Sequence, residues 1–264
     1  MAATVIIPAR FGSTRFPAKI LASETGKPLV QHVVDRVRLC KRVSRILVAT
    51  DDVRIVDALK PFGTECVMTS PAHPSGTDRI AEVARGLMDN VLINVQGDEP
   101  EIEPSVVDGL VEHMEGSGDE MATAATPFGA GEMGGVGVEV GNPNLVKVVT
   151  GVGGYALYFS RSAIPFQRDA GGTGGVGPEY LQHLGIYAYR REFLLRYAGW
   201  SPTPLEVAEK LEQLRALEHG VRLFVMRVAR ATQGIDTAEQ YRGFVERYKG
   251  KGSSLETSGV TASA

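Results

Sequence analysis

Residues 5–19 read VIIPARFGSTRFPAK, a short apolar run that leads directly into a cationic loop. The run Val5–Ile7 is typical of a buried strand. Pro8 is expected to stop that strand, because proline has no N–H group to donate to a ladder. The stretch therefore predicts an early strand that opens into a loop at its carboxyl end.

The loop itself carries groups that suit a polyphosphate ligand. Arg10, Arg15 and Lys19 supply positive charge, and the chain near Gly12 and Ser13 can aim backbone N–H groups at one point. The pattern is neither a Walker A motif nor GxGxxG, which disfavours a P-loop or a dinucleotide site. A solvated loop between a strand and a helix is the alternative that these residues alone leave open.

Length and composition fit one large α/β domain or two small ones, since the chain has 264 residues. A formal net charge of −3 gives no reason to expect a nucleic acid or a membrane surface as partner. Cys40 and Cys66 lack metal-ligand spacing and indicate free thiols in a reducing compartment. No stretch approaches the ~20 apolar residues of a membrane span, and no signal-peptide pattern opens the chain. We therefore expect a cytoplasmic protein.

Apolar runs alternate with amphipathic helices through the first half of the chain. Further strands are predicted at 46–49, 66–68 and 91–95. With the first strand, these alternations predict a mostly parallel sheet covered by helices on both faces. Asp51 or Asp52 is expected to cap the helix after the second strand, and metal binding by this pair is the alternative.

Two polar segments follow the third and fourth of these strands. In the loop 69–79, Ser75 or Thr77 can cap the next helix, and the small residues leave N–H groups for a ligand. The fourth strand ends in QGDEP, residues 96–100. Open α/β sheets place ligands and metal ions at such carboxyl ends of buried strands.

The second half is richer in glycine. Glycine-rich stretches at 130–141 and 171–177 predict mobile loops, and the tail from Gly250 is too polar to order itself. Asp236 or Thr237 can cap a last helix whose apolar face carries Tyr241, Phe244, Val245 and Tyr248. The other elements predicted here are strands near 121–127, 146–149, 155–159, 181–189 and 221–228 and a helix at 205–217.

Four blocks carry a resemblance to a known family: residues 6–19, HPSGTDRIAEVA at 73–84, NVQGDEP at 94–100 and Asp236-Thr237. EKLEQLR at 209–215 and HLGIYAYR at 183–190 extend it. Together they resemble the 3-deoxy-manno-octulosonate (Kdo) cytidylyltransferases, or CMP-Kdo synthetases, of lipopolysaccharide biosynthesis.

The resemblance implies a Rossmann-like nucleotidyltransferase fold of three layers, with a mixed, mostly parallel sheet and a smaller β-rich second lobe. It implies a single domain over residues 1–249. A nucleotide-binding lobe would cover about 1–120, and a part for sugar binding and dimerisation about 121–249, before a disordered tail at 250–264. A homodimer is expected from the family.

The implied reaction is CTP plus Kdo giving CMP-Kdo plus pyrophosphate, by in-line attack of the anomeric hydroxyl on the α-phosphorus. Such a transfer needs charge neutralisation and alignment. The implied catalytic residues are Arg10 and Lys19 on the triphosphate and Asp98 and Asp236 on Mg²⁺. The metal would polarise the α-phosphate and lower the pKa of the hydroxyl, so no dedicated base is named. Glu99 is expected to support Asp98 or the fold.

The resemblance also implies two sets of binding residues. The nucleotide set is Ala9, Arg10, Gly12, Ser13, Lys19, Ser75, Arg79 and Gln96. The sugar set is Gln96, Arg161, His183, Tyr187, Glu212 and Gln213. Ser75 and Arg79 would read the cytosine, and Arg161 would pair with the Kdo carboxylate. The alternatives are a surface role for Arg161 and exposed helix polarity for Glu212 and Gln213, which lie off the leucine stripe of the predicted helix.

One departure from the family pattern concerns the first loop. The family typically reads LPGKPL where this chain reads FPAKIL, and alanine at Ala18 restricts φ where glycine would not. Lys19 is retained. The competing functions are transfer to another sugar (8-amino-Kdo, a nonulosonate or a hexose phosphate) and a catalytically silent nucleotide-binding or scaffold protein.

Overall fold

A computed structural model of the chain describes residues 3–13, 15–128, 140–168, 179–230 and 234–257. The predicted glycine-rich loop 171–177 and most of 130–141 lie outside these residues. The elements are β1 Ala3–Ala9, η1 Lys19–Leu21, α1 Leu29–Val37, β2 Val43–Thr50, α2 Val53–Leu59, η2 Lys60–Phe62, β3 Cys66–Met68, α3 Gly76–Ala84, β4 Val91–Asn94, α4 Pro104–Gly116, β5 Met121–Pro127, β6 Lys147–Thr150, β7 Ala156–Ser160, β8 Leu181–Arg190, α6 Arg191–Tyr197, α7 Pro204–Glu209, α8 Gln213–Glu218, β9 Leu223–Arg227 and α9 Ala238–Thr257.

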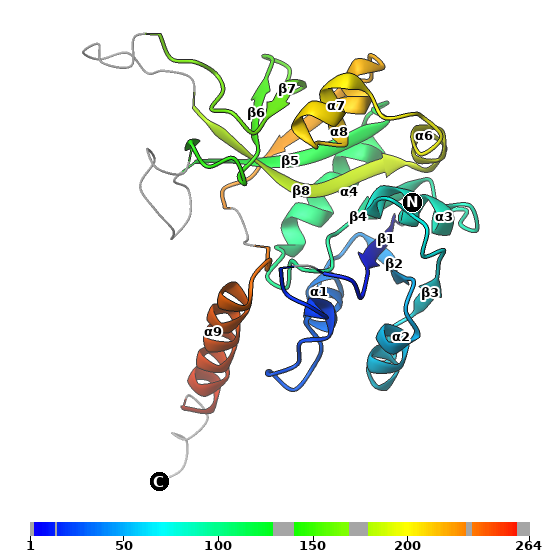
Figure 1. The fold of residues 1–264 in the computed structure, drawn as a ribbon, viewed down its shortest axis with the longest axis vertical. Coiled ribbons are helices and arrows are strands. Elements are labelled where there is room, and N and C mark those ends of the chain that lie inside the picture. Colours follow the sequence, from blue (N-terminus) through cyan, green and yellow to red (C-terminus); the bar gives the residue numbers. More distant parts are fainter. Residues whose placement is uncertain (1–2, 14, 129–139, 169–178, 231–233, 258–264) are drawn as a thin grey trace.

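The described strands form one mixed sheet in the order β3-β2-β1-β4-β8-β5-β9, with β6 on β8 and β7 on β6 (Figure 1). β1, β2, β3 and β4 are parallel to one another, as the alternation of strands and helices predicts. β8 then joins antiparallel to both β4 and β5. The strands of the second half therefore extend the sheet of the first half, and the predicted mixed α/β fold is confirmed.

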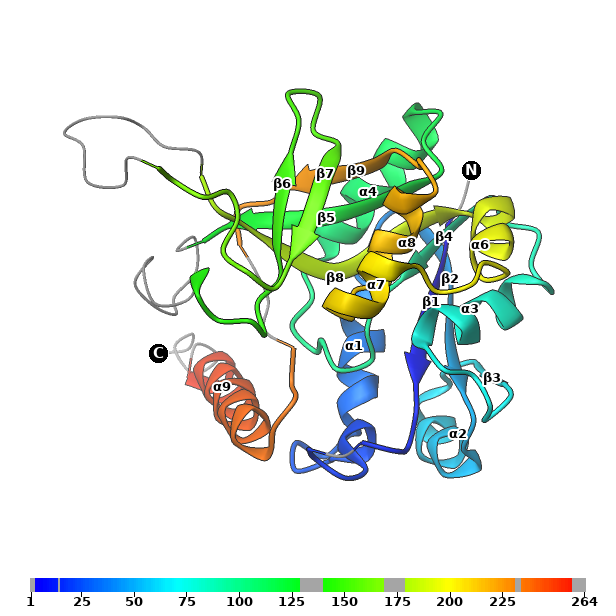
Figure 2. The same ribbon diagram turned by 45° about the horizontal axis from the view of Figure 1, so that its top comes forward.

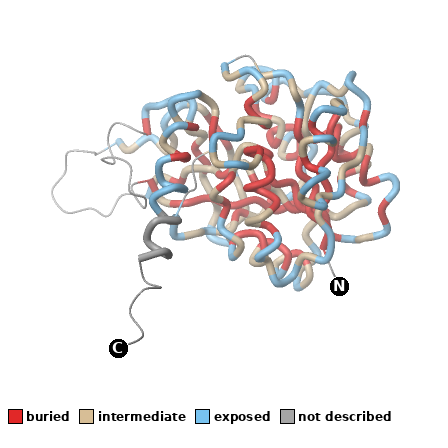
Figure 3. Tube along the Cα trace, turned by 90° about the horizontal axis from the view of Figure 1, so that it is seen from below, coloured by how far each residue is buried: buried red, intermediate tan, exposed pale blue. Residues whose placement is uncertain are grey.

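Helices cover both faces of this sheet and create two cores (Figure 2). One core packs α1, α2 and α4 against side chains such as Val5 and Ile93. The other packs α3, α6 and α8 against side chains such as Ile6 and Leu92, which alternate with the first set along their strands. In Figure 3 the buried residues lie in the interior of the trace, between the exposed loops.

β1 continues through Pro8, so the prediction that this proline stops the strand is wrong. Pro8 pairs with Ala49 of β2 in the parallel register. The carbonyl of Ile6 accepts the N–H of Val95 and so faces β4. Pro8, two residues further on, faces the same side, but the β1–β4 pairing has already ended at Ile6 and Asn94. No described strand lies opposite Pro8 on that side, so the N–H group that proline lacks costs the sheet no hydrogen bond.

The segment predicted as one helix over 205–217 is instead two short helices. Lys210 adopts left-handed backbone angles, with φ 54°, and separates α7 from α8. A buried ion pair joins the two helices, with Arg215 Nε 2.7 Å from Glu206 Oε2. The bend places Gln213 in the interior, only 3% exposed, so the exposed-polarity alternative is wrong for this residue.

The last helix, α9, begins with a capping box. The Thr237 hydroxyl accepts the N–H of Gln240, and the Gln240 side chain accepts the N–H of Thr237 in return. The helix continues to Thr257, beyond Gly250, because elongation of a helix that is already anchored fixes only one more residue per hydrogen bond. The rest of the predicted tail lies outside the described residues. Within the described parts of the chain, no helix has both the length and the apolar character to cross a membrane.

Candidate active site

A cleft of about 350 Å³ opens at the carboxyl ends of β1, β3 and β4. Parallel strands direct their following loops to this edge, and β1 lies at the point where the chain turns to β2 on one side and to β4 on the other. The predicted site residues that line it are Ala9, Arg10, Gly12, Ser13, Lys19, Ser75, Arg79, Gln96, Asp98, Glu212 and Asp236. Arg161, His183, Tyr187 and Gln213 are not among the lining residues.

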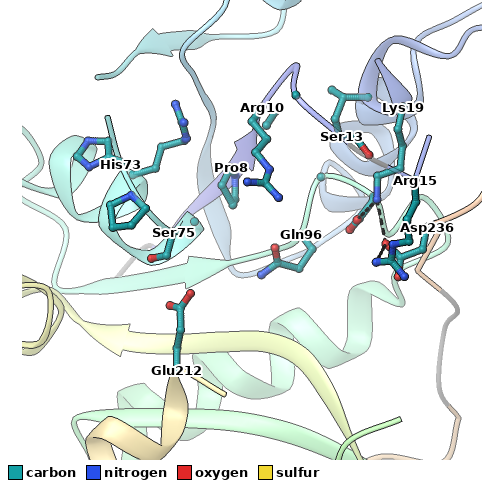
Figure 4. Close-up of a pocket in the computed structure, with 18 residues that line it drawn as sticks. Pro8, Arg10, Ser13, Arg15, Lys19, His73, Ser75, Gln96, Glu212 and Asp236 are labelled. Carbon is teal, nitrogen blue, oxygen red and sulfur yellow. Dashed lines mark hydrogen bonds and ion pairs between the residues drawn. The ribbon is translucent and has the colours of Figure 1, made fainter. Parts of the chain in front are cut away.

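Four of the lining side chains form the charged end of the cleft (Figure 4). Lys19 Nζ lies 2.6 Å from Asp98 Oδ2 and 3.2 Å from Asp236 Oδ1. Arg15 lies 2.9 Å from the same oxygen of Asp236. The two carboxylates, which are 138 residues apart in sequence by subtraction of their numbers, therefore converge on one position of positive charge.

Backbone contacts bring these two carboxylates together. The N–H of Ile235 donates to the carbonyl of Asp98 at 2.8 Å, which fastens the segment before α9 to the loop after β4. Two carboxylates facing one cation suit Mg²⁺, which takes few protein ligands and completes its shell with phosphate oxygens and water. Among the described residues, no group of three or more His, Cys, Asp or Glu side chains is placed to hold a metal ion. The donor set thus fits a metal that is shared with a phosphate ligand.

Lys19 reaches this position from an unusual backbone turn. Ala18 has φ 53° and ψ 25°, in the left-handed region, and directly precedes η1. The Lys19 side chain is only 10% exposed. The doubt that the sequence raised about alanine at this position is physically real, because the turn adopts the conformation that glycine would favour.

Glu99 lies beside the charged end without lining it. Burial raises the pKa of Glu99 to about 8, and the adjacent Asp98 carboxylate acts in the same direction. Its side chain packs near the backbone of Gly185 and Gly234. A supporting position next to Asp98, as the sequence suggests, matches this placement.

Two glycines allow the loops to close around Pro8 at the floor of the cleft. A Cβ at Gly97 would come 2.9 Å from the Pro8 carbonyl oxygen, and one at Gly76 would come 3.4 Å from the Pro8 ring. Sequence reasoning did not assign these positions, nor the lining residue His73, whose ring contacts Glu82. The signal for Gly97 was present, since it lies between Gln96 and Asp98 in the QGDEP block.

The other end of the cleft is held by the start of α3. Ser75 caps that helix, accepting the N–H of Asp78. Arg79 is 4% exposed, and its guanidinium lies 2.5 Å from Thr69 Oγ1 and 2.7 Å from Asp51 Oδ2. Asp51 thus fixes Arg79 and Asp52 caps α2, which confirms the capping prediction for this acidic pair.

Glu212 faces Ser75 across the cleft, and Gln96 lies between the two ends (Figure 4). The amide of Gln96 donates to the Gly185 carbonyl at 3.2 Å, which links the loop after β4 to β8. Burial raises the pKa of Glu212, while a hydrogen bond from Thr77 acts in the opposite direction. Both side chains present hydrogen-bonding groups at the face opposite the cations.

Arg161 lies away from the cleft, at the junction of α7 and α8. Its guanidinium donates to the carbonyls of Glu209, Pro143 and Lys210, at 2.7, 2.9 and 3.3 Å. Its backbone N–H donates to the Glu209 carboxylate. In this conformation Arg161 stabilises the chain just before Glu212, and its role in sugar binding stays a prediction.

His183 and Tyr187 lie side by side on β8, with ring centroids 5.4 Å apart and the ring planes tilted by 48°. Burial lowers the pKa of His183 to about 3, so its imidazole is neutral. Thr123 has a single hydroxyl proton, which it donates to the Ile186 carbonyl at 2.7 Å. His183 Nε2, 3.0 Å from the same hydroxyl, is then the donor, which leaves Nδ1 as an acceptor. Gln213 Nε2 is buried without a partner among the described residues.

The Cytidylyltransferase family matches residues 4–223. A 3-deoxy-manno-octulosonate cytidylyltransferase from Trichlorobacter lovleyi is 45% identical, over 94% of this chain and 99% of that one. The protein of the same name from Geobacter sulfurreducens is 46% identical, over 93% and 99%. The chain belongs to the 3-deoxy-manno-octulosonate cytidylyltransferase family.

Solved structures agree with this membership. The structure of CMP:2-keto-3-deoxy-manno-octonic acid synthetase complexed with CTP matches with a TM-score of 0.87 and 38% identity, covering 95% of this chain and all of that one. A 4-diphosphocytidyl-2C-methyl-D-erythritol synthase matches with a TM-score of 0.59 at 11% identity, which shows a shared fold alone. The resemblance that the sequence blocks carry is therefore confirmed, and this cytidylyltransferase has the predicted nucleotidyltransferase fold.

Proposed function

We propose that the chain transfers CMP from CTP to the anomeric hydroxyl of Kdo, releasing pyrophosphate. The observation that carries this proposal is the convergence of Lys19, Asp98 and Asp236 in one cleft at the carboxyl edge of the sheet. The names of the full-length relatives supply the substrate class. The cleft supplies the groups that the reaction needs.

The cations of the first loop would hold the triphosphate. Arg10 and Lys19 line the cleft together with Gly12 and Ser13, whose backbone N–H groups can also reach a phosphate. The departing pyrophosphate gains negative charge as its bond to the α-phosphorus lengthens. Fixed cations stabilise that charge without having to reorganise.

Mg²⁺ would be held by Asp98 and Asp236. When bound, it supplies positive charge that polarises the α-phosphate and lowers the pKa of the attacking hydroxyl. The hydroxyl oxygen of Kdo forms the new bond to the α-phosphorus, the bond to the bridging oxygen breaks, and the hydroxyl proton passes to solvent. The chain's own contribution is the alignment of the two substrates.

The two ends of the cleft would divide the substrates. Ser75 and the fixed guanidinium of Arg79 lie where the cytosine would be read. Gln96 and Glu212 present groups to sugar hydroxyls from the opposite face (Figure 4). Arg161, His183, Tyr187 and Gln213 complete the proposed sugar set from positions that do not line the cleft in this conformation.

We extend the proposal to a cytoplasmic homodimer. Cys40 and Cys66 are both free thiols, as expected in a reducing compartment. Light scattering of the purified chain checks the oligomeric state, and a monomeric mass at micromolar concentration would contradict the dimer.

Pyrophosphate release tests the function directly. CTP, ATP and GTP are each combined with Kdo, 8-amino-Kdo, a nonulosonate and a hexose 1-phosphate, with and without Mg²⁺. We expect release only with CTP, Kdo and Mg²⁺. Equal use of the three nucleotides would overturn the cytosine-reading assignment, and a preference for another sugar would replace Kdo.

Two variants test the metal assignment in the same assay. Asp98→Asn and Asp236→Asn should each lower turnover by about a hundredfold or more, because the charge on the reacting phosphates is no longer neutralised. Asp57→Asn, the same change on an exposed residue of α2, is the matched control. Full activity in either cleft variant would refute the metal assignment.

A further inference from the structure

The ammonium of Lys19 occupies the position where two carboxylates meet. It lies 2.6 Å from Asp98 Oδ2 and 3.2 Å from Asp236 Oδ1, and its side chain is 10% exposed. Within the described residues, these two carboxylates form ion pairs with Lys19 and Arg15 only. Arg15, whose side chain is 62% exposed, also contacts Asp236 Oδ1.

A divalent metal and this ammonium cannot share the position. Mg²⁺ bonds carboxylate oxygens at about 2.0–2.1 Å and needs the lone pairs that face the cation. In the structure, the Lys19 ammonium holds one oxygen of each carboxylate. The metal ion and the ammonium would also repel each other strongly at such a short separation, because the Lys19 side chain is largely buried and water screens the charges little.

We infer that Lys19 is the resident cation of the metal position in the free protein, and that the triphosphate of the nucleotide draws it away so that the metal can enter. This inference rests on the proposed function, which assigns Lys19 to the triphosphate and the two aspartates to the metal. Nucleotide and metal then bind with positive coupling, and each raises the affinity of the other by the same factor.

The local structure allows this exchange. The ammonium is a point charge on a flexible stem of four carbons, so it can turn from the carboxylates to a phosphate while the backbone stays in place. Arg10, in the same cleft, is paired with neither carboxylate and so is ready to bind phosphate without being released first. Once Lys19 turns away, Asp98 lacks a neutralising partner and Asp236 keeps only the exposed Arg15, so a divalent cation restores the balance.

Binding of Mn²⁺ in the absence of turnover tests the inference. Water-proton relaxation reports protein-bound Mn²⁺, first without nucleotide and then with α,β-methylene CTP, which cannot release pyrophosphate. Without nucleotide, Lys19→Met should bind Mn²⁺ about tenfold more tightly than the unchanged chain, a factor within the usual range of coupling between sites. The analogue should raise Mn²⁺ affinity in both chains, because its phosphate oxygens complete the shell of the metal. The rise should be about tenfold larger in the unchanged chain, where the analogue also draws Lys19 away.

Three variants make this result specific. Arg10→Met removes one positive charge from the same cleft and should leave nucleotide-free Mn²⁺ affinity unchanged. Lys19→Arg keeps a cation between the carboxylates and should bind Mn²⁺ weakly, like the unchanged chain. Lys19→Met combined with Asp98→Asn should lose the gain. Lys19→Gln serves as the second neutral variant if Lys19→Met does not fold.

The inference is overturned if the neutral variants bind Mn²⁺ no more tightly than the unchanged chain. It is also overturned if Arg10→Met gains as much as they do, since the gain would then reflect net charge alone. These outcomes are separable from failure of the proposed function. If the chain releases pyrophosphate from CTP and Kdo but shows no such Mn²⁺ effect, the proposed function holds and the inference fails. If the Mn²⁺ effect is present but Kdo is not turned over, the inference holds and the proposed function fails.

Discussion

Ala18 combines a short side chain with a backbone conformation that its Cβ opposes. Its φ of 53° lies in the left-handed region, which costs an L-residue roughly 1–2 kcal/mol. Ala18→Gly removes that cost but adds about 0.4–1 kcal/mol of unfolded-chain entropy. We therefore expect a net gain of about 1 kcal/mol in the free energy of unfolding. The shift of the urea midpoint measures it, provided that the dependence of this free energy on urea concentration (the m-value) is unchanged.

Ala22 provides the control for this change. It follows the same short helix but has φ −55°, which alanine adopts without strain. Ala22→Gly should therefore lower stability, by about 0.5–1 kcal/mol. If both substitutions shift the midpoint in the same direction, the effect is not one of backbone strain at Ala18.

At the scale of single residues, sequence reasoning found the groups whose role depends on local pattern. Asp98 and Ser75 were found because each follows a strand or begins a helix within a specific block. Arg161 and Gln213 were harder to place, because their surroundings depend on how α7 and α8 meet. No local pattern shows that three carbonyl oxygens surround a guanidinium, as they do at Arg161.

The packing of α9 sets the position of Asp236, which lies two residues before the helix begins. A third cluster of buried side chains, including Ile235, Tyr241 and Phe244, packs the start of this helix against Leu29 of α1. Phe16 of the first loop contacts Tyr241, with ring centroids 5.6 Å apart. The same helix therefore sets the position of a predicted metal ligand and supports the loop that carries Lys19.

Tyr241→Ala should loosen the anchoring of α9 and with it the position of Asp236. The Tyr241 hydroxyl accepts the N–H of Glu24 at 2.8 Å, and truncating a large buried aromatic costs about 3–5 kcal/mol. We expect the Mg²⁺ concentration for half-maximal turnover to rise, because Asp236 is no longer held near Asp98. The measurement is the Mg²⁺ dependence of pyrophosphate release.

Phe193→Ala is the matched control, because Phe193 is a fully buried residue of α6 that does not line the cleft. It should lower the free energy of unfolding by a similar amount while the Mg²⁺ dependence stays the same. An equal change in Mg²⁺ dependence for the two variants would mean that general loss of stability, and not the anchoring of α9, explains the effect.

Element boundaries were predictable where the pattern is continuous. The run 66–68 and the strand 121–127 were placed correctly, because apolar runs and their flanking polar turns differ sharply in composition. The break between α7 and α8 was not, because the leucine spacing across Lys210 suits a continuous helix. The left-handed turn is stabilised by the buried contact between Glu206 and Arg215. These residues are nine positions apart, so the spacing of neighbours on a continuous helix does not predict the contact.

For the molecule as a whole, a segment from early in the chain and one from late in the chain pack together beside the cleft. α1 and the first loop come from the beginning of the sequence and α9 from its end. His32 lies at this junction, 5% exposed, between Thr25, whose hydroxyl is 2.6 Å from Nε2, and the rings of Phe244 and Tyr248. Burial lowers the pKa of His32 to about 4, and the positive charge of Lys27 acts in the same direction, against the Asp35 carboxylate.

Acid should therefore loosen this junction. The usual pKa of histidine is about 6.5, so between pH 6.5 and about 4 the unfolded chain binds the proton more readily than the folded one. The stability that neutral His32 contributes is complete above pH 6.5 and falls as the pH drops, by about 1.4 kcal/mol per pH unit. His32→Asn can keep a hydrogen bond to Thr25 but does not titrate, so its free energy of unfolding should fall less steeply over this range.

The difference between the two chains isolates His32, because His183, whose pKa is also lowered by burial, titrates in both. Urea unfolding at pH 7.5, 6.5, 5.5 and 4.5 gives the two curves. They should be parallel above pH 6.5 and converge below it, as protonation removes the advantage of the histidine. Parallel curves down to pH 4.5 would show that His32 is accessible to protons in the folded chain. The packing of Phe244 and Tyr248 on His32 would then not exclude the protonated imidazole from this junction.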